Sequence, residues 1–181
     1  EFMWYPAEVD VSIRLGWFYH PLQRFTLKSL NHLMKIYYTS AGNNSLFLLN
    51  IPPNKNGLLA NSDVKRLKEM GKWLKKEDEL VIKDFTRKDD QDGFEIRLHF
   101  PKQSVDRIRL SEDTTKSQRV EKFSIYANGS KIFGGTIIGF SKIAIFEPTV
   151  TDNLTIKIEE CRKEPYINKT EVVATGAYRL K

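Results

Sequence analysis

The sequence predicts an α/β segment over residues 1–79 followed by an all-β segment over residues 80–181. In the first segment, apolar residues recur with a helical period in two stretches, and a short apolar run, Leu46–Leu49, lies between them. After residue 79 the pattern changes to short alternating stretches separated by turn pairs that contain glycine. Short strands at this spacing favour an antiparallel β-sandwich or jelly roll.

The first segment opens with the end of a strand and its following loop over residues 4–10, and Gly16 and Pro21 mark the loop that comes next. A helical stripe begins near Thr26, and Gly42 with Asn43 provides its stop signal. The apolar residues of this stripe are Leu27, Leu30, Leu33, Met34, Tyr37 and Tyr38. We therefore expect a helix between the two predicted strands.

The run Leu46–Leu49 suits a strand of a parallel sheet that is buried on both faces. A second helix then follows, for which Asn61 or Ser62 is the expected N-cap, and Trp73 is expected near the edge of its apolar face. Its inward positions are Val64, Leu67, Met70, Gly71 and Leu74. The order strand, helix, strand, helix is typical of α/β proteins.

The second segment contains eight stretches with strand character. They are Leu80–Phe85, Phe94–Phe100, Val105–Leu110, Lys122–Tyr126, Lys131–Phe133, Thr136–Phe140, Ile143–Phe146 and Leu154–Ile158.

Composition narrows the class of protein. Hydrophobic residues make up 40% of the 181 residues, which is enough for a core and argues against global disorder. The single cysteine, Cys161, excludes an internal disulfide and a zinc site with several cysteines. The His, Cys and Asp spacings suggest no metal, and no apolar run reaches membrane-spanning length. We therefore expect no metal, no cofactor and no membrane partner.

The net charge of +6 raises the question of nucleic-acid binding. The densest basic region, residues 65–76, has a helical period, so a solvated helix face is the favoured interpretation and no nucleic-acid partner is expected. Four Asn-x-Ser/Thr sequons would matter only in a secreted eukaryotic protein. They begin at Asn43, Asn128, Asn153 and Asn168.

The stretch from Trp4 to His20 combines carboxylates, an arginine and several aromatic rings. Sugar sites are built from such residues, because carboxylates move protons and aromatic faces cover the apolar side of a pyranose. An aromatic-rich segment is also typical of a protein core, and composition alone leaves both interpretations open.

The order of these residues favours the sugar-site interpretation. The pattern W-x-P-A-E-V-D-V-S-I-R-x-G-W-F-Y-H, which ends at His20, resembles the acid/base segment of α-L-fucosidases of glycoside hydrolase family 29. The resemblance continues through Leu48–Pro53 to Asp63, with a weaker echo over residues 118–123 and 136–140. It differs from the usual family pattern at Leu15, where proline is usual, and at Asn43, where arginine is common.

This resemblance implies that residues 1–79 are the last part of a catalytic (β/α)8-type barrel and residues 80–181 a C-terminal β-sandwich. It places the general acid/base at Glu8, at the carboxyl end of a barrel strand, where Trp4 and Tyr5 would raise its pKa by desolvation. The family's nucleophile is an Asp on an earlier strand, outside this chain, so the chain alone is expected to be inactive.

The resemblance further implies a fucosylated glycan as substrate, with the motif closest to the branch that acts on α-1,3/1,4-linked fucose. Trp17 and His20 are candidate substrate contacts, and Asn50 lies at the expected active end of its strand. Asp10 is interpreted as structural, paired with Arg14. The compartment stays open among secreted, periplasmic and lysosome-like. The rival interpretation is a non-catalytic carbohydrate-binding sandwich or an inactive relic of the family.

Overall fold

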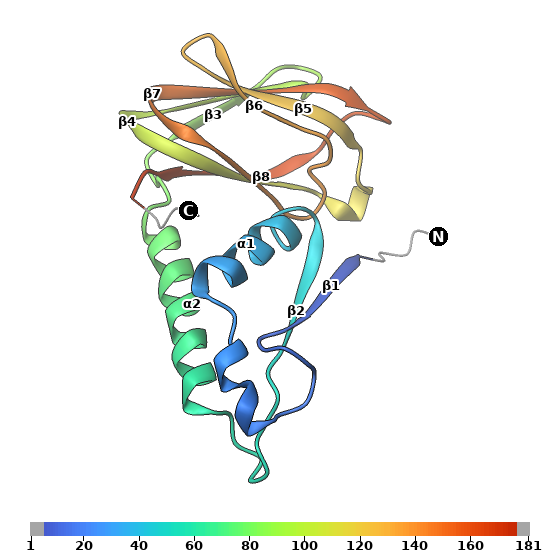
Figure 1. The fold of residues 1–181 in the computed structure, drawn as a ribbon. Coiled ribbons are helices and arrows are strands. Elements are labelled where there is room, and N and C mark those ends of the chain that lie inside the picture. The colour runs from blue at the N-terminus through green and yellow to red at the C-terminus, as the bar shows by residue number, and fades with distance from the viewer. Residues whose placement is uncertain (1–5, 177–181) are drawn as a thin grey trace.

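The computed structural model describes residues 6–176 and contains two parallel strands, two α-helices and a larger antiparallel sheet (Figure 1). Strand β1 (Ala7–Ser12) pairs with β2 (Ser45–Asn50) in parallel, from Ala7 opposite Ser45 to Ser12 opposite Asn50. The connection between them runs through the 3-10 helix η1 (Pro21–Thr26) and helix α1 (Leu30–Ser40). Helix α2 (Asn61–Glu79) follows β2, which confirms the predicted order of elements.

Helix α1 begins four residues later than the sequence suggested, because residues up to Thr26 form η1 instead. The start is fixed by Ser29, whose Oγ accepts a hydrogen bond from the backbone N–H of His32 at 3.2 Å. The helix ends before Gly42, as predicted. A Cβ at Gly42 would lie 2.5 Å from the carbonyl oxygen of Tyr38, so the chain can turn away here only at a glycine.

The helices and one face of the β1–β2 pair enclose a first core. Leu33, Met34, Tyr38, Met70 and Trp73 are buried in it. Phe47 and Leu49 of β2 pack against these residues with one face of the strand. Trp73 was expected near the helix edge, but it is 2% exposed, since its ring lies between α2 and α1 and donates its N–H to Tyr38. Helix α2 begins after Ala60, which makes no side-chain cap, so the predicted capping role of Asn61 or Ser62 is wrong.

Most of the remaining chain forms one antiparallel sheet in the order β3-β4-β7-β5-β6, with β8 beside β4. The strands are β3 (Thr86–Asp89), β4 (Glu95–Glu112), β5 (Val120–Ala127), β6 (Ser130–Gly135), β7 (Lys142–Cys161) and β8 (Ile167–Ala174). A short 3-10 helix, η2 (Thr114–Lys116), joins β4 to β5. The predicted antiparallel character is confirmed.

The long strands β4 and β7 fold this sheet into a β-sandwich. The first half of β4 pairs with β3 and with the second half of β7, whereas its second half pairs with β8 and with the first half of β7. Register shifts interrupt β4 between His99 and Gln103 and between Val105 and Arg107, where the strand passes from one layer to the other. Ile96 and Leu98 from one half and Ile108 from the other then share one core.

The bending of β4 and β7 explains why each of these strands was predicted as two. The stretches predicted at residues 94–100 and 105–110 are one strand, β4, and those at 143–146 and 154–158 are one strand, β7. Residues 80–85 and 136–140 lie outside the named strands, and β8 was not predicted.

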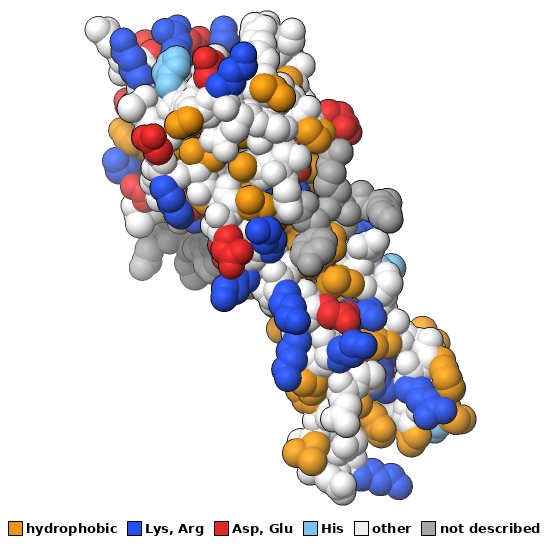
Figure 2. Space-filling view, turned by 90° about the vertical axis from the view of Figure 1, so that its left-hand side faces the viewer, with side chains coloured by type: hydrophobic (Ala, Val, Ile, Leu, Met, Phe, Trp, Pro, Cys, Tyr) orange, Lys and Arg blue, Asp and Glu red, His pale blue; other side chains and the backbone are white. Residues whose placement is uncertain are grey.

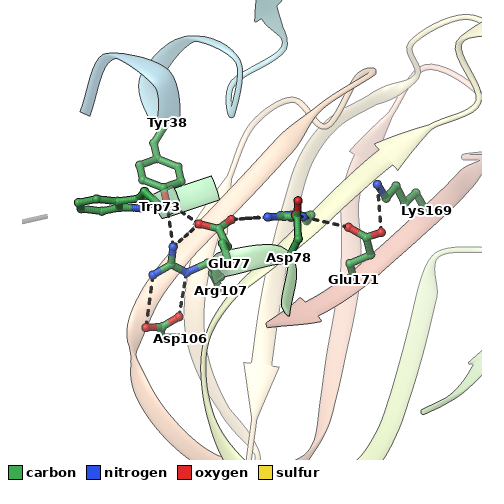
Figure 3. Close-up of polar contacts among 9 residues, drawn as sticks. Tyr38, Trp73, Glu77, Asp78, Asp106, Arg107, Lys169 and Glu171 are labelled. Carbon is green, nitrogen blue, oxygen red and sulfur yellow. Dashed lines mark hydrogen bonds and ion pairs between the residues drawn. The ribbon is translucent and has the colours of Figure 1, made fainter. Parts of the chain in front are cut away.

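A buried polar network joins the helices to the sandwich (Figure 3). Glu77, at the end of α2, accepts hydrogen bonds from Tyr38 Oη at 2.5 Å and from Arg107 on β4 at 2.6 Å. Arg107 also pairs with Asp106 at 2.9 Å. Arg109 contacts the other oxygen of Glu77 at 2.8 Å. The helices and the sandwich are thereby held together by charge-assisted contacts, of which the Glu77–Arg107 pair is buried and Arg109 lies partly open to solvent.

Candidate active site

Glu8 is the second residue of β1 and lies opposite Leu46 of β2. The strand continues to Ser12, so the predicted strand end at residues 4–10 is wrong, and Glu8 lies near the amino end of β1. Side chains alternate along a strand, and Asp10 therefore shares the face of Glu8; both residues are exposed. Trp4 and Tyr5, the expected source of desolvation for Glu8, lie outside the described residues.

The carboxyl end of β1 carries a small hydrogen-bonded cluster. Ser12 Oγ donates to the carbonyl oxygen of Gly16 at 2.7 Å. Asn50, at the end of β2, donates from Nδ2 to Ser12 Oγ at 3.2 Å and to the carbonyl oxygen of Trp17 at 3.0 Å. Asn50 therefore does more than terminate its strand, because it holds the backbone of the loop that presents Trp17.

Trp17 and His20 lie on this loop and are open to solvent. Trp17 is 50% exposed. His20 is the N-cap of η1, and its Nδ1 accepts a hydrogen bond from the backbone N–H of Leu22 at 3.3 Å. Within residues 6–176, no hydrogen bond joins Glu8 to either residue. Glu8 thus lies near the amino end of β1, whereas Trp17 and His20 lie on the loop beyond its carboxyl end, and all three are exposed.

Arg14 does not pair with Asp10, as the sequence had suggested. Its guanidinium forms a fork on Asp63, with Nε–Oδ2 at 2.9 Å and Nη2–Oδ1 at 2.7 Å, and both side chains are at most 1% exposed. Asp63 lies in the first turn of α2, where a carboxylate also interacts favourably with the helix dipole. The pair therefore ties the end of β1 to the start of α2, and Asp10 stays exposed on the strand.

Sequence reasoning missed an exposed apolar surface on the α/β part of the chain. The apolar run of β2 was recognised, but it was expected to be buried on both faces. Leu46 is 40% and Leu48 is 50% exposed, on the same face of the β1–β2 pair as Glu8 and Asp10. The loops at the carboxyl ends of these strands add further exposed apolar residues: Leu15, Phe18, Leu22, Phe25, Leu58 and Leu59. Figure 2 shows hydrophobic side chains gathered at the end of the molecule away from the sandwich. Surfaces of this extent mark places where another protein part packs.

Residues 6–176 contain no group of three His, Cys, Asp or Glu side chains that could hold a metal ion. No helix in this range is long and apolar enough to cross a membrane.

The comparisons with known proteins agree on the family that this chain resembles. A family model described as alpha-L-fucosidase matches residues 3–79. Alpha-L-fucosidase 1 of Arabidopsis thaliana is 53% identical over 66 residues, which make up 36% of this chain and 13% of that protein. The aligned part is thus a small fraction of the curated relative.

Two solved structures extend the similarity over the sandwich. A candidate alpha-L-fucosidase from Bacteroides ovatus superposes with a TM-score of 0.86 at 36% identity, over 98% of this chain and 32% of that chain. A glycoside hydrolase 29 family member from an unknown rumen bacterium superposes with a TM-score of 0.80 at 31% identity, over 98% of this chain and 34% of that chain. The chain spans about a third of each. These matches agree with one another: residues 3–79 match the alpha-L-fucosidase family model, and the chain as a whole is similar to the C-terminal portion of α-L-fucosidases of glycoside hydrolase family 29.

Proposed function

We propose that the chain is the C-terminal portion of a retaining α-L-fucosidase. Residues 1–79 would complete a (β/α)8 barrel, and residues 80–181 would form the sandwich domain behind it. The observation that carries the proposal is the uneven burial of the β1–β2 pair. Helices cover one of its faces, while the other exposes Glu8 and Asp10 beside Leu46 and Leu48.

A (β/α)8 barrel requires this division of faces. Its parallel strands pack one face against the surrounding helices and direct the other into the barrel interior. Leucines on an inner face are covered when the remaining strands close the barrel. The exposed face of β1 and β2 is therefore the surface on which the remainder of the catalytic domain would pack, in a protein of the length of the solved relatives.

In the proposed reaction Glu8 acts as the general acid/base. Retaining glycosidases use two carboxyl groups about 5–5.5 Å apart, of which one attacks the sugar and the other protonates the leaving oxygen and later activates water. Glu8 supplies the second group, and an Asp outside this chain supplies the nucleophile. Asp10 lies on the same face and is the alternative carboxylate that an experiment must distinguish from Glu8.

Trp17 and His20 are proposed as contacts to the glycan. The exposed indole offers a flat apolar face to a sugar ring, and the imidazole can bond a hydroxyl through the nitrogen that does not cap η1. We further propose α-1,3/1,4-linked fucose as the substrate, on the basis of the motif that ends in Gly16–His20. Rates on a panel of linkage-defined fucosyl oligosaccharides test this assignment.

The role of Glu8 is tested in the complete enzyme that contains this chain, with Glu8→Gln and the matched variant Asp10→Asn. Loss of a general acid lowers kcat by about 10²–10⁴-fold on natural leaving groups. On an aryl fucoside whose leaving group needs no protonation, kcat/KM should fall much less, whereas kcat should stay low because the fucosyl-enzyme lacks the base that activates water. Azide should restore turnover of Glu8→Gln and give the fucosyl azide of retained configuration.

The assignment of Glu8 would be overturned if Asp10→Asn showed this signature while Glu8→Gln kept full activity. Fucoside turnover by the 181-residue chain alone that Glu8→Gln abolishes would instead overturn the placement of the nucleophile, because both carboxylates would then lie within the chain.

A further inference from the structure

Helix α2 carries a straight row of lysines on its outer face. Lys65, Lys68, Lys72 and Lys75 follow one another at spacings of three, four and three residues, which keeps them on one side of a helix. All four are exposed. Figure 2 looks onto this side of the molecule and shows basic side chains gathered along α2, between the sandwich and the apolar end. We call these four residues the α2 lysine row.

The row is not neutralised by neighbouring carboxylates. Within residues 6–176, none of its four members forms an ion pair, although acidic residues lie on the same helix. Glu69 is engaged by Arg66 at 2.7 Å, and Glu79 lies 3.9 Å from Lys76, just beyond the row. Glu77 is buried and faces the sandwich. Four like charges at positions i, i+3, i+7 and i+10 repel each other, and no ion pair within the described chain offsets this cost.

The row also borders a hollow. Lys72 and Lys75 line a depression of about 450 Å³ together with Lys76, Glu79 and Gly176. A linear ligand bound along α2 could therefore enter this depression at the sandwich end of the row.

We propose that the α2 lysine row is a binding surface for a linear acidic polysaccharide, one that carries a carboxylate or sulfate on successive sugar units. At a rise of 1.5 Å per residue, spacings of three and four residues place the lysines about 4.5–6 Å apart along the axis. This is close to the length of one pyranose unit, so the spacing of charge along the row matches that of a polymer with about one charge per sugar. Lysine suits such a partner, because its ammonium group is a point charge on a flexible side chain. Unlike the planar guanidinium of arginine, it does not require a fixed bidentate geometry.

The surroundings of the row favour this partner over a nucleic acid. Single-stranded nucleic acids bind where bases stack on exposed aromatic rings beside a basic groove. The one aromatic residue of α2, Trp73, is 2% exposed and faces the core. A duplex carries about one charge per 1.7 Å of its axis, which is denser than a single file of lysines can match. The proposal does not rest on fucosidase activity, because the row lies on the helix face opposite the first core.

The test uses the 181-residue chain and fluorescently labelled polygalacturonate oligomers, with binding followed by anisotropy at several salt concentrations. Lys68→Gln/Lys72→Gln removes two charges from the row. Lys88→Gln/Lys102→Gln removes the same charge from exposed positions on β3 and β4 and is the matched control. Circular dichroism verifies that both variants keep their fold.

We expect the row variant to bind at least tenfold more weakly and with a shallower salt dependence, while the control changes affinity less than twofold. Sulfated dextran in place of polygalacturonate distinguishes sulfate from carboxylate recognition, and binding of either supports the proposal. Equal loss in both variants would overturn it, because net charge alone would then explain binding. Absence of binding, equal binding of neutral dextran, or tighter row-dependent binding of an oligonucleotide would also overturn it.

Discussion

Glu77 of α2 and Arg107 of β4 form an ion pair of 2.6 Å in which both side chains are 1% exposed. The two residues are 30 positions apart and belong to the helical layer and to the sandwich. Arg109 reaches the same carboxylate from two residues further along β4 at 2.8 Å. One buried carboxylate therefore anchors two arginines of the sandwich.

We expect Glu77→Gln to destabilise the chain by about 3–5 kcal/mol, because it breaks a buried ion pair and removes the carboxylate that Arg107 and Arg109 share, so that Asp106 alone neutralises the buried guanidinium of Arg107. Urea denaturation measures this loss. Glu79→Gln is the control, since that side chain is 54% exposed and its contact with Lys76 is 3.9 Å long; its effect should lie within about 0.5 kcal/mol. Equal effects of the two substitutions would contradict the structural role of Glu77.

Tyr38 should make the chain sensitive to alkaline pH. Burial raises the pKa of its phenol above the ordinary value, and the hydrogen bond to Glu77 and the charge of Glu77 add to this, while Arg107 opposes it. A raised pKa in the folded state means that the unfolded chain loses the proton first. The stabilisation is complete below about pH 10, the unfolded value, and is lost as pH rises toward the folded pKa.

The measurement is the free energy of unfolding between about pH 9 and pH 12 for wild type and Tyr38→Phe. The wild-type curve should fall more steeply above about pH 10. At neutral pH the variant should be less stable by about 1–3 kcal/mol, because the indole N–H of Trp73 loses its acceptor. Parallel curves for the two proteins would show that Tyr38 ionises normally.

Asp63 and Asp10 should respond differently to truncation. Asp63→Ala removes the partner of a buried arginine, and we expect a loss of about 3–5 kcal/mol in the free energy of unfolding. Asp10→Ala changes an exposed carboxylate of β1 and should stay within about 0.5 kcal/mol. Thermal or urea unfolding compares the two. A large loss for Asp10→Ala alone would restore the pairing with Arg14 that the sequence suggested.

The exposed face of the β1–β2 pair should drive self-association of the isolated chain. We expect Leu46→Lys/Leu48→Lys to shift sedimentation toward monomer without lowering the free energy of unfolding, since both leucines are already open to solvent. Val150→Lys, at a residue that is 58% exposed on β7, is the control and should leave association unchanged. Unaltered association of the double variant would indicate that another surface is responsible.

Local pattern was enough to predict the class of each part of this protein. Helical periods located α1 and α2, and turn pairs with alternating residues predicted an antiparallel sheet, because these signals depend on neighbours in the chain. The motif around Glu8 was enough to indicate the family, because its residues are contiguous in the chain. The role of Glu8 itself stays a prediction.

Tertiary structure alone decided which charges pair and which faces are covered. Arg14 binds Asp63 rather than Asp10, and Glu77 binds Arg107, over separations of 49 and 30 residues that no local pattern encodes. The apolar run of β2 was expected to be buried on both faces, yet Leu46 and Leu48 are exposed. Sequence gives each residue its preference for burial, but whether that preference is met depends on what packs against it.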